Sequence, residues 1–115
     1  MSEILPLKSN KMNETFKQQV FEIIKMIPKG RVTTYGAIAK AVGFPNHSRY
    51  VGNALRNYDE DFPAHRVCSA CGTISAESCI PKFTEKLAKE GVEVKGNKIQ
   101  NFKQIFWNPL EEINL

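Results

Sequence analysis

Two turn sequences in the first half of the chain limit its fold more than any other feature. Residues 28–30 read Pro-Lys-Gly and residues 43–46 read Gly-Phe-Pro-Asn, and proline and glycine both interrupt helices. Apolar residues recur at helical spacing before, between and after these turns, at Phe16, Val20, Ile23, Ile24 and Ile27, then Ile38, Ala39 and Val42, then Val51, Ala54 and Leu55. This pattern predicts three helices.

The two shorter helices form the more informative pair. The first of them follows Thr33 or Thr34, either of which can cap it, and the second runs from about His47 to Asn57. A tight turn that contains glycine joins them, which is the layout of a helix-turn-helix. The longer helix is expected to begin near Asn13 and to end at the Pro-Lys-Gly turn.

The second half of the chain is less regular. Residues 67–74 include Gly72 and predict a small β-hairpin. Pro81 suits the first turn of a further helix, and Gly91 suits its C-terminal end. An aromatic cluster, Phe102, Phe106 and Trp107, lies near the end of the chain. We therefore expect a mainly helical fold with a small hairpin.

No composition shift or linker divides the chain. We predict a flexible N-terminal arm over residues 1–12, one domain over residues 13–109 and a C-terminal tail over residues 110–115. A length of 115 residues suits a single domain with a single core.

Charge and hydropathy set broad limits on function. No stretch approaches the roughly 20 apolar residues of a membrane span, and the N-terminus lacks the apolar segment of a secretory signal. We expect a cytoplasmic protein with no membrane partner. The net charge of +4 suits a polyanionic partner such as DNA or RNA without requiring one.

Three sequence blocks carry the functional information. They read PKGRVTTYG at residues 28–36, SRYVGNAL at 48–55 and PAHRV at 63–67, the last followed by GTIS at 72–75. In this order and spacing they resemble the DNA-binding, catalytic domain of the O6-alkylguanine-DNA alkyltransferases. The resemblance extends from Phe16 to Gly91, with a weaker match at residues 106–109. It implies a winged helix-turn-helix-like fold of the alkyltransferase C-terminal type.

One position departs from the family pattern. The family signature in the third block is Pro-Cys-His-Arg-Val, in which the cysteine accepts the alkyl group, whereas this chain has Ala64 there. Transfer requires a thiolate that attacks the alkyl carbon, and alanine has no nucleophilic atom. The chain is therefore similar to the alkyltransferase-like proteins, which keep the DNA-binding module and replace the cysteine.

The resemblance implies a mode of DNA binding. In the family the helix-turn-helix enters the minor groove, and the target guanine is flipped into a pocket. Arg49 matches the arginine that fills the gap left by the flipped base, and Tyr35 matches a tyrosine that crowds the target phosphate. The expected DNA-binding residues are Thr34, Tyr35, Arg49, Gly52, Asn53 and Arg56.

The resemblance also implies a pocket for the flipped base. Its expected residues are Tyr35, Ala64, Val67, Ser78 and Trp107. His65 and Glu90 match the family's proton relay. No thiol stands beside them at position 64, so we expect them to shape the pocket through hydrogen bonds.

Several of these residues have a plain structural interpretation as well. Arg49 could be a solvated residue that pairs with a phosphate, and Tyr35 or Trp107 could simply pack in the core. A glycine inside a helix is unfavourable, so Gly52 serves close packing, either against another helix or against DNA.

The cysteines carry little functional information. Cys68 and Cys71 form a single Cys-x-x-Cys pair, and with His65 and Cys79 nearby a zinc site is conceivable. One such pair at this compressed spacing is a weak indication, and an odd number of cysteines does not indicate a disulfide framework. We predict no metal and no cofactor.

Three functions compete on this sequence. The leading one is a non-enzymatic, monomeric sensor that binds double-stranded DNA with O6-alkylguanine lesions and, by family resemblance, recruits nucleotide excision repair. The second is an active methyltransferase in which Ala64 is an engineered replacement of the acceptor cysteine. The third is a helix-turn-helix transcription regulator that reads the major groove.

Overall fold

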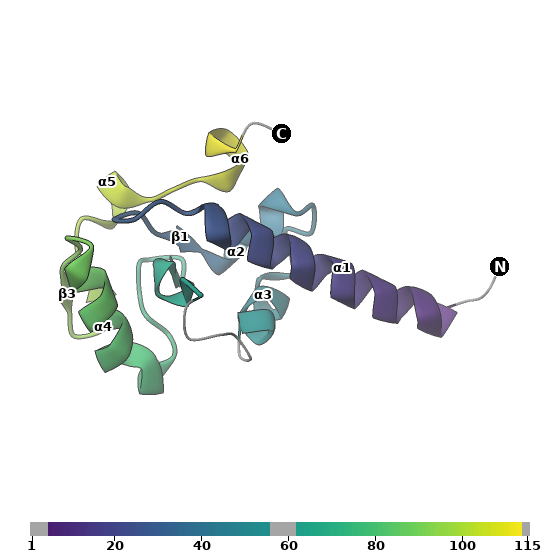
Figure 1. Ribbon diagram of the computed structural model, residues 1–115, viewed down its shortest axis with the longest axis horizontal. Helices are drawn as coiled ribbons and strands as arrows, with labels where there is room; N and C mark the ends of the chain where they lie inside the picture. The colour runs from purple at the N-terminus through teal and green to yellow at the C-terminus, as the bar shows by residue number, and fades with distance from the viewer. Residues whose placement is uncertain (1–4, 56–61, 114–115) are drawn as a thin grey trace.

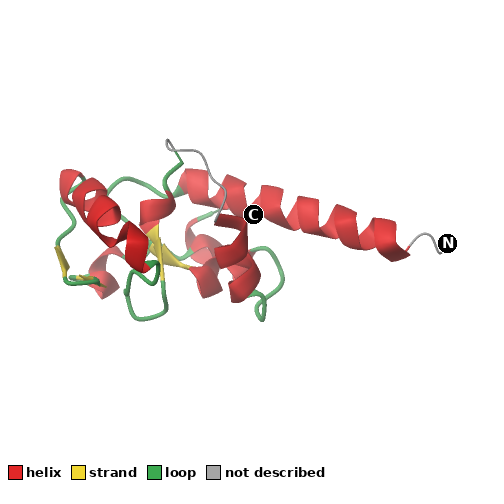
Figure 2. Cartoon of the chain, turned by 90° about the horizontal axis from the view of Figure 1, so that it is seen from below, coloured by secondary structure: helices red, strands yellow, loops and turns green. Residues whose placement is uncertain are grey.

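The computed structural model describes residues 5–55 and 62–113, with side chains from residue 15 onward, as one body with a long projecting helix (Figures 1 and 2). That helix is α1, Leu5–Met26. Its C-terminal half packs on α2, Tyr35–Ala41, and α3, Ser48–Ala54, while its N-terminal half extends away from the rest of the molecule. The three predicted helices are all present.

The start of α1 differs from the prediction. The helix begins at Leu5, so Asn13 lies inside it and residues 5–12 are helical instead of a loose arm. Lysine, methionine and leucine in this stretch favour a helix, and Pro6 falls in the first turn, where its missing N–H breaks no helical hydrogen bond. Polarity alone was a poor guide to order here.

The helix-turn-helix is confirmed, and Thr34 is its cap. The Thr34 hydroxyl accepts a hydrogen bond from the Ala37 amide at 3.0 Å, which satisfies a donor that the first turn of α2 leaves free. Gly43 ends the turn after α2 with a φ of +92°, a conformation that favours glycine. α3 ends in the structure at Ala54, and its predicted extension to Asn57 lies outside the described residues.

The predicted apolar faces meet in one core. Four side chains are fully buried where the three helices pack together, namely Val20 and Ile24 of α1, Ile38 of α2 and Val51 of α3. The second half of the chain closes this core with Leu87 and further apolar side chains. Burial of these faces is what holds α2 and α3 in a fixed relation.

The predicted hairpin at residues 67–74 is wrong. β2, Val67–Cys68, pairs in parallel with β1, Thr33–Thr34. Residues 69–73 form a tight turn, and beyond it Ile74 donates its amide hydrogen to the Asn97 carbonyl at 2.8 Å. β2 therefore pairs with a strand far away in the sequence, and the segment after the turn hydrogen-bonds to a different hairpin.

That different hairpin escaped the sequence analysis. It consists of β3, Val94–Lys95, and β4, Lys98–Ile99, with Val94 opposite Ile99. Its signal was the dipeptide Gly96-Asn97 between two residues of each strand, which is a typical two-residue hairpin turn.

The remaining elements are short. They are η2, Ala64–Arg66, η3, Glu77–Cys79, α4, Ile80–Lys89, α5, Phe102–Ile105, and α6, Pro109–Glu112. Pro81 lies in the first turn of α4 and Gly91 directly follows its cap, as predicted. None of the described helices is both long and apolar enough to cross a membrane.

The C-terminal segment is tied to the start of β1. The Trp107 amide donates to the Val32 carbonyl at 2.7 Å, and the Arg31 guanidinium donates to the carbonyl of Phe106 at 2.8 Å. Arg31 also pairs with Glu112 of α6 at 2.9 Å. These contacts place Trp107 in the core, with only 4% of its surface exposed.

Candidate nucleic-acid interface

A cavity of about 630 Å³ opens between the helix-turn-helix and the segment that leads into α4. Its size falls in the usual range for sites that enclose a small organic group. Six residues singled out from the sequence line it together, namely Tyr35, Arg49, Gly52, Asn53, Ala64 and Ser78. These residues come from four separate elements, so the fold brings the predicted set to one place.

One wall of the cavity is built by α2 and α3. The Thr34 cap makes Tyr35 the first residue of α2, and its hydroxyl lies 3.5 Å from the Ser75 hydroxyl on the opposite wall. Arg49 and Gly52 are separated by one helical turn on α3, so they face the same side. Arg49 is exposed, which leaves its guanidinium free to reach beyond the protein surface.

The floor of the cavity is apolar. Ala64, at the start of η2, is 4% exposed and is accompanied by Leu55 and Phe83, both buried. The opposite rim carries the hydroxyls of Ser75 and Ser78. An apolar floor with a polar rim suits a flat ring that has polar edges and an apolar substituent.

Among the other residues that line the cavity, Ser69 and Phe83 were not expected there from the sequence. Phe83 lies in α4, the helix predicted to begin near Pro81, and an apolar residue in a helix gives no sign that one edge of its ring borders a cavity. Ser69 belongs to the segment at residues 67–74 that was predicted to be a hairpin.

Three predicted site residues lie elsewhere. Val67 and Trp107 are buried in the core and do not line the cavity, because Val67 pairs with Thr33 and the Trp107 amide bonds to Val32. Thr34 is 8% exposed and its hydroxyl caps α2, so its side chain is part of the scaffold. Arg56 lies outside the described residues.

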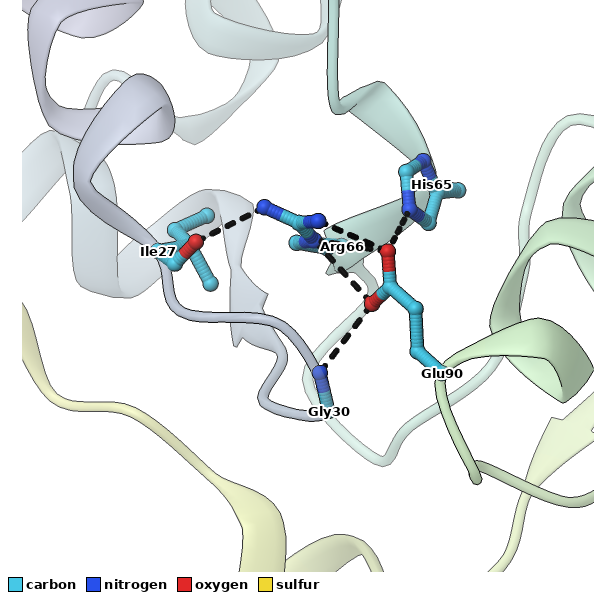
Figure 3. A network of polar contacts seen from close by, with 5 residues as sticks. All are labelled: Ile27, Gly30, His65, Arg66 and Glu90. Carbon is cyan, nitrogen blue, oxygen red and sulfur yellow. Dashed lines mark hydrogen bonds and ion pairs between the residues drawn. The ribbon is translucent and has the colours of Figure 1, made fainter.

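A buried polar network supports the floor from behind (Figure 3). The Glu90 carboxylate accepts hydrogen bonds from the Gly30 amide at 3.1 Å, from His65 Nε2 at 2.8 Å and from Arg66 Nη2 at 2.7 Å. Arg66 Nη1 donates to the Ile27 carbonyl at 2.8 Å. The network thus joins η2 to the ends of α1 and α4, and it fixes the residue that follows Ala64.

The same contacts set the charge state of the network. Burial raises the pKa of Glu90, but the hydrogen bonds from Arg66, His65 and the Gly30 amide outweigh it and lower the pKa to about 2. Burial lowers the pKa of His65 more than its hydrogen bond to Glu90 raises it. Near neutral pH the carboxylate is therefore charged and the imidazole neutral, with its Nε2–H donated to Glu90.

The cysteines are free thiols in different environments. Cys68 is buried and Cys71 is exposed, so the Cys-x-x-Cys pair does not converge on one point. Among residues 15–55 and 62–113, no three histidine, cysteine or acidic side chains lie close enough together to hold a metal ion.

The β3–β4 hairpin braces the cavity wall. The Ile99 amide donates to the Gly72 carbonyl and the Ile74 amide to the Asn97 carbonyl, both at 2.8 Å, directly before Ser75. Gly72 has a φ of +81°, and a Cβ there would lie 2.9 Å from Cγ of Phe102. This glycine is required both by its backbone conformation and by close contact.

We predict that Gly72→Ala lowers the free energy of unfolding by about 2 kcal/mol, since a left-handed alanine is strained and its methyl group meets Phe102. Chemical denaturation measures this loss. Gly36→Ala is the control: Gly36 lies in α2 with nothing within 4 Å of an added Cβ, so stability should rise by about 0.5–1 kcal/mol. Equal effects of both variants would contradict the prediction.

Comparison with known sequences gives a consistent result. Residues 15–92 match the family profile described as 6-O-methylguanine DNA methyltransferase, DNA binding domain. A protein of Vibrio parahaemolyticus named DNA base-flipping protein is 38% identical over 84% of this chain and 99% of its own length. Alkyltransferase-like protein 1 of Schizosaccharomyces pombe is 33% identical over 84% of this chain and 97% of its own length.

Comparison of structures points the same way. The crystal structure of S. pombe Atl1 in complex with damaged DNA containing O6-carboxymethylguanine superposes with a TM-score of 0.75 and 32% identity. The match covers 82% of this chain and 95% of that protein.

Proposed function

This chain belongs to the alkyltransferase-like family, and we propose that it binds double-stranded DNA and flips O6-alkylguanine into the cavity beside α3 without transferring the alkyl group. The observation that carries the proposal is a cavity that begins at Arg49 and ends on the methyl group of Ala64. A relative that matches this chain over 99% of its own length is named for base flipping, and another is seen with damaged DNA.

The position of Ala64 supports recognition without chemistry. Its side chain lies on the apolar floor, directly before the His65 that Glu90 holds. Alkyl transfer needs a thiolate there, and alanine has none. The histidine and glutamate keep a structural task, because they join the floor to α1 and α4.

Cys68 is not a substitute acceptor in this proposal. Its thiol is fully buried and donates a hydrogen bond to the Thr33 carbonyl at 3.4 Å. Burial raises the pKa of this thiol to about 12, so the reactive thiolate is scarce at neutral pH.

Cys79 needs separate consideration because it lines the cavity. In the described part of the chain neither His65 nor Glu90 hydrogen-bonds to the Cys79 sulfur, and the two residues are instead bonded to each other. We propose that Cys79 is part of the wall and accepts no alkyl group.

The geometry of α3 supports base flipping. The exposed Arg49 has the planar, charged group that can occupy the gap left by an extruded base, and Tyr35 stands at the mouth. A Cβ on Gly52 would meet none of the described residues within 4 Å, so packing against these residues does not explain this helical glycine. Close approach of DNA does explain it.

Further parts of the proposal rest on family resemblance. We propose that the protein acts as a monomer, that residues 13–109 carry the function, and that the marked lesion is passed to nucleotide excision repair proteins. The cytoplasm is the location proposed with this role.

A pair of duplexes that differ only in one O6-methylguanine tests the proposal. The damaged base pairs weakly, which makes flipping easier, and its methyl group gains an apolar contact at the floor. We expect the damaged duplex to bind at least about 10-fold more tightly, which corresponds to about 1.4 kcal/mol. Fluorescence anisotropy of a labelled duplex measures this, because Trp107 is buried outside the cavity.

Intact-mass measurement completes the test. The protein should gain no methyl group after incubation with the damaged duplex. Equal affinity for both duplexes would refute lesion recognition, and binding that depends on base sequence alone would favour a transcription regulator. A gain of one methyl group would refute the non-enzymatic role, and peptide mapping would show whether Cys79 carries it.

A further inference from the structure

A second cleft lies on an adjoining face of α3 from the cavity described above, which we now call the lesion cavity. It has a volume of about 400 Å³ and is lined chiefly by Phe16, Lys17, Phe44, His47, Tyr50 and Asn53. Its side chains come from α1, from the turn of the helix-turn-helix and from α3. We call it the aromatic groove.

Four rings form a continuous surface in this groove. The centroids of Phe16 and Phe44 are 5.8 Å apart, those of Phe44 and His47 are 5.2 Å apart, and those of His47 and Tyr50 are 4.9 Å apart. Such edge-to-face and tilted contacts stabilise the rings against one another and hold them in place. Tyr50 ends the row and is 55% exposed.

The two clefts share α3. Arg49 and Gly52 line the lesion cavity, Tyr50 lines the aromatic groove, and Asn53 lines both. A helix with its side chains is about 10–12 Å across, whereas the minor groove of B-DNA is about 6 Å wide. A helix that enters this groove therefore touches both of its walls.

The groove also has the charge that a DNA wall requires. Lys17 lines the groove, and Arg49 directly precedes the lining residue Tyr50 in α3. No aspartate or glutamate is among the described residues that line the groove. The walls of the minor groove consist of deoxyribose rings and phosphates. An exposed tyrosine ring beside a lysine offers an apolar surface for the sugar and a positive charge for the phosphate.

We propose that the aromatic groove binds the sugar–phosphate backbone of the undamaged strand, with Tyr50 against a deoxyribose and Lys17 paired with a phosphate. This inference rests on the proposed function, since the lesion cavity on the adjoining face of α3 then takes a nucleotide of the damaged strand. Contacts of this kind position the protein on the duplex and do not read the base.

Variants of Tyr50 and of Lys17 test the contact on damaged and undamaged duplexes. Tyr50→Ala should weaken binding to both by about 3- to 10-fold and leave their ratio unchanged, whereas Tyr50→Phe should bind like the wild type. Lys17→Ala should reduce the slope of log affinity against log salt by about one. Lys103→Ala is the matched control, because α5 lies at the opposite end of the body from α3 (Figure 1).

Neutral methylphosphonate linkages identify the strand. Placed one at a time in the undamaged strand, one of them should weaken binding of the wild type and have no further effect on Lys17→Ala. Unchanged affinity of Tyr50→Ala on both duplexes overturns the inference, as does a sensitive phosphate found only in the damaged strand. A lost preference for the damaged duplex in Tyr50→Ala also overturns it, because the ring would then act in the lesion cavity.

The test separates the two proposals. Loss of affinity can be measured on the undamaged duplex alone, so the groove can be established even if the protein shows no preference for O6-methylguanine. Conversely, tighter binding to the damaged duplex together with an unchanged affinity of Tyr50→Ala would support the proposed function and contradict the role of the aromatic groove. Both variants replace exposed side chains, and thermal unfolding should confirm that they fold normally.

Discussion

Replacement of Glu90 by alanine is expected to destabilise the folded protein by about 3–5 kcal/mol, the usual range when one partner of a buried ion pair is removed. Arg66, His65 and Glu90 are buried to a similar degree, with 12%, 8% and 10% of their side chains exposed. Without the carboxylate, the Arg66 charge would remain buried with only the Ile27 carbonyl to receive its hydrogen bonds. Urea denaturation at neutral pH, followed by circular dichroism, measures the loss.

Two control variants isolate the charge. Glu90→Gln keeps an acceptor for the Gly30 amide but loses the ion pair, so its stability should lie between those of the wild type and Glu90→Ala. Glu93→Ala removes a nearby exposed carboxylate and should change stability by less than about 0.5 kcal/mol. If Glu90→Ala behaves like Glu93→Ala, the network does not support the fold.

The stability of the wild type should also depend on pH through this network. The folded-state pKa of Glu90 is about 2, below its ordinary value of 4.5, so its contribution is complete above pH 4.5 and is lost as the pH falls toward 2. The lowered pKa of His65 acts in the same direction, because below pH 6.5 the unfolded state takes up a proton that the folded state does not. Glu90→Gln should lack the loss between pH 4.5 and 2.

Local sequence signals were sufficient to predict that α1, α2, α3 and α4 are present, but not where α1 begins. The apolar spacing identified the faces of α1, α2 and α3, and Thr34 was expected as one of two possible caps before its hydroxyl was found to bond the Ala37 amide. Helices are stabilised by contacts between residues three or four positions apart, so their evidence lies within a short window.

The strands could not be predicted in the same way. β1 and β2 contain two residues each and are separated by more than 30 positions, so neither has a visible period. Their pairing depends on the core into which Val67 folds, and that is a property of the whole chain. The assignment of Val67 to the cavity was wrong for the same reason.

The cavity lining shows what resemblance adds and where it ends. Tyr35, Arg49 and Ala64, which the motif matches singled out, line one cavity although they are distant in the sequence. The same reasoning failed for Trp107, since the position of a C-terminal segment depends on the contacts it makes in this chain. Here hydrogen bonds to Arg31 and Val32 hold the backbone of residues 106–107 beside β1, and the indole is buried in the core.

Replacement of Arg49 by alanine should remove most of the preference for O6-methylguanine, because the gap left by the flipped base would then be empty. Unstacking a base costs a few kcal/mol, so affinity for the damaged duplex should fall by roughly 10- to 100-fold. Affinity for the undamaged duplex should fall only a few-fold, as expected for the loss of one charge near phosphates. Because Arg49 is exposed, its replacement should leave the stability of the fold unchanged.

Arg49→Lys separates the two roles that the sequence left open. It keeps the positive charge but not the planar group that stacks on neighbouring bases. If Arg49 fills the gap, the lysine variant should bind undamaged DNA with the wild-type salt dependence and lose its preference for the lesion. If Arg49 only neutralises a phosphate, lysine should restore both affinities and alanine should weaken both equally. A 2-aminopurine placed beside the lesion should brighten on binding to the wild type, since its stacking is broken, and should brighten less with either variant if the arginine holds the base outside the duplex.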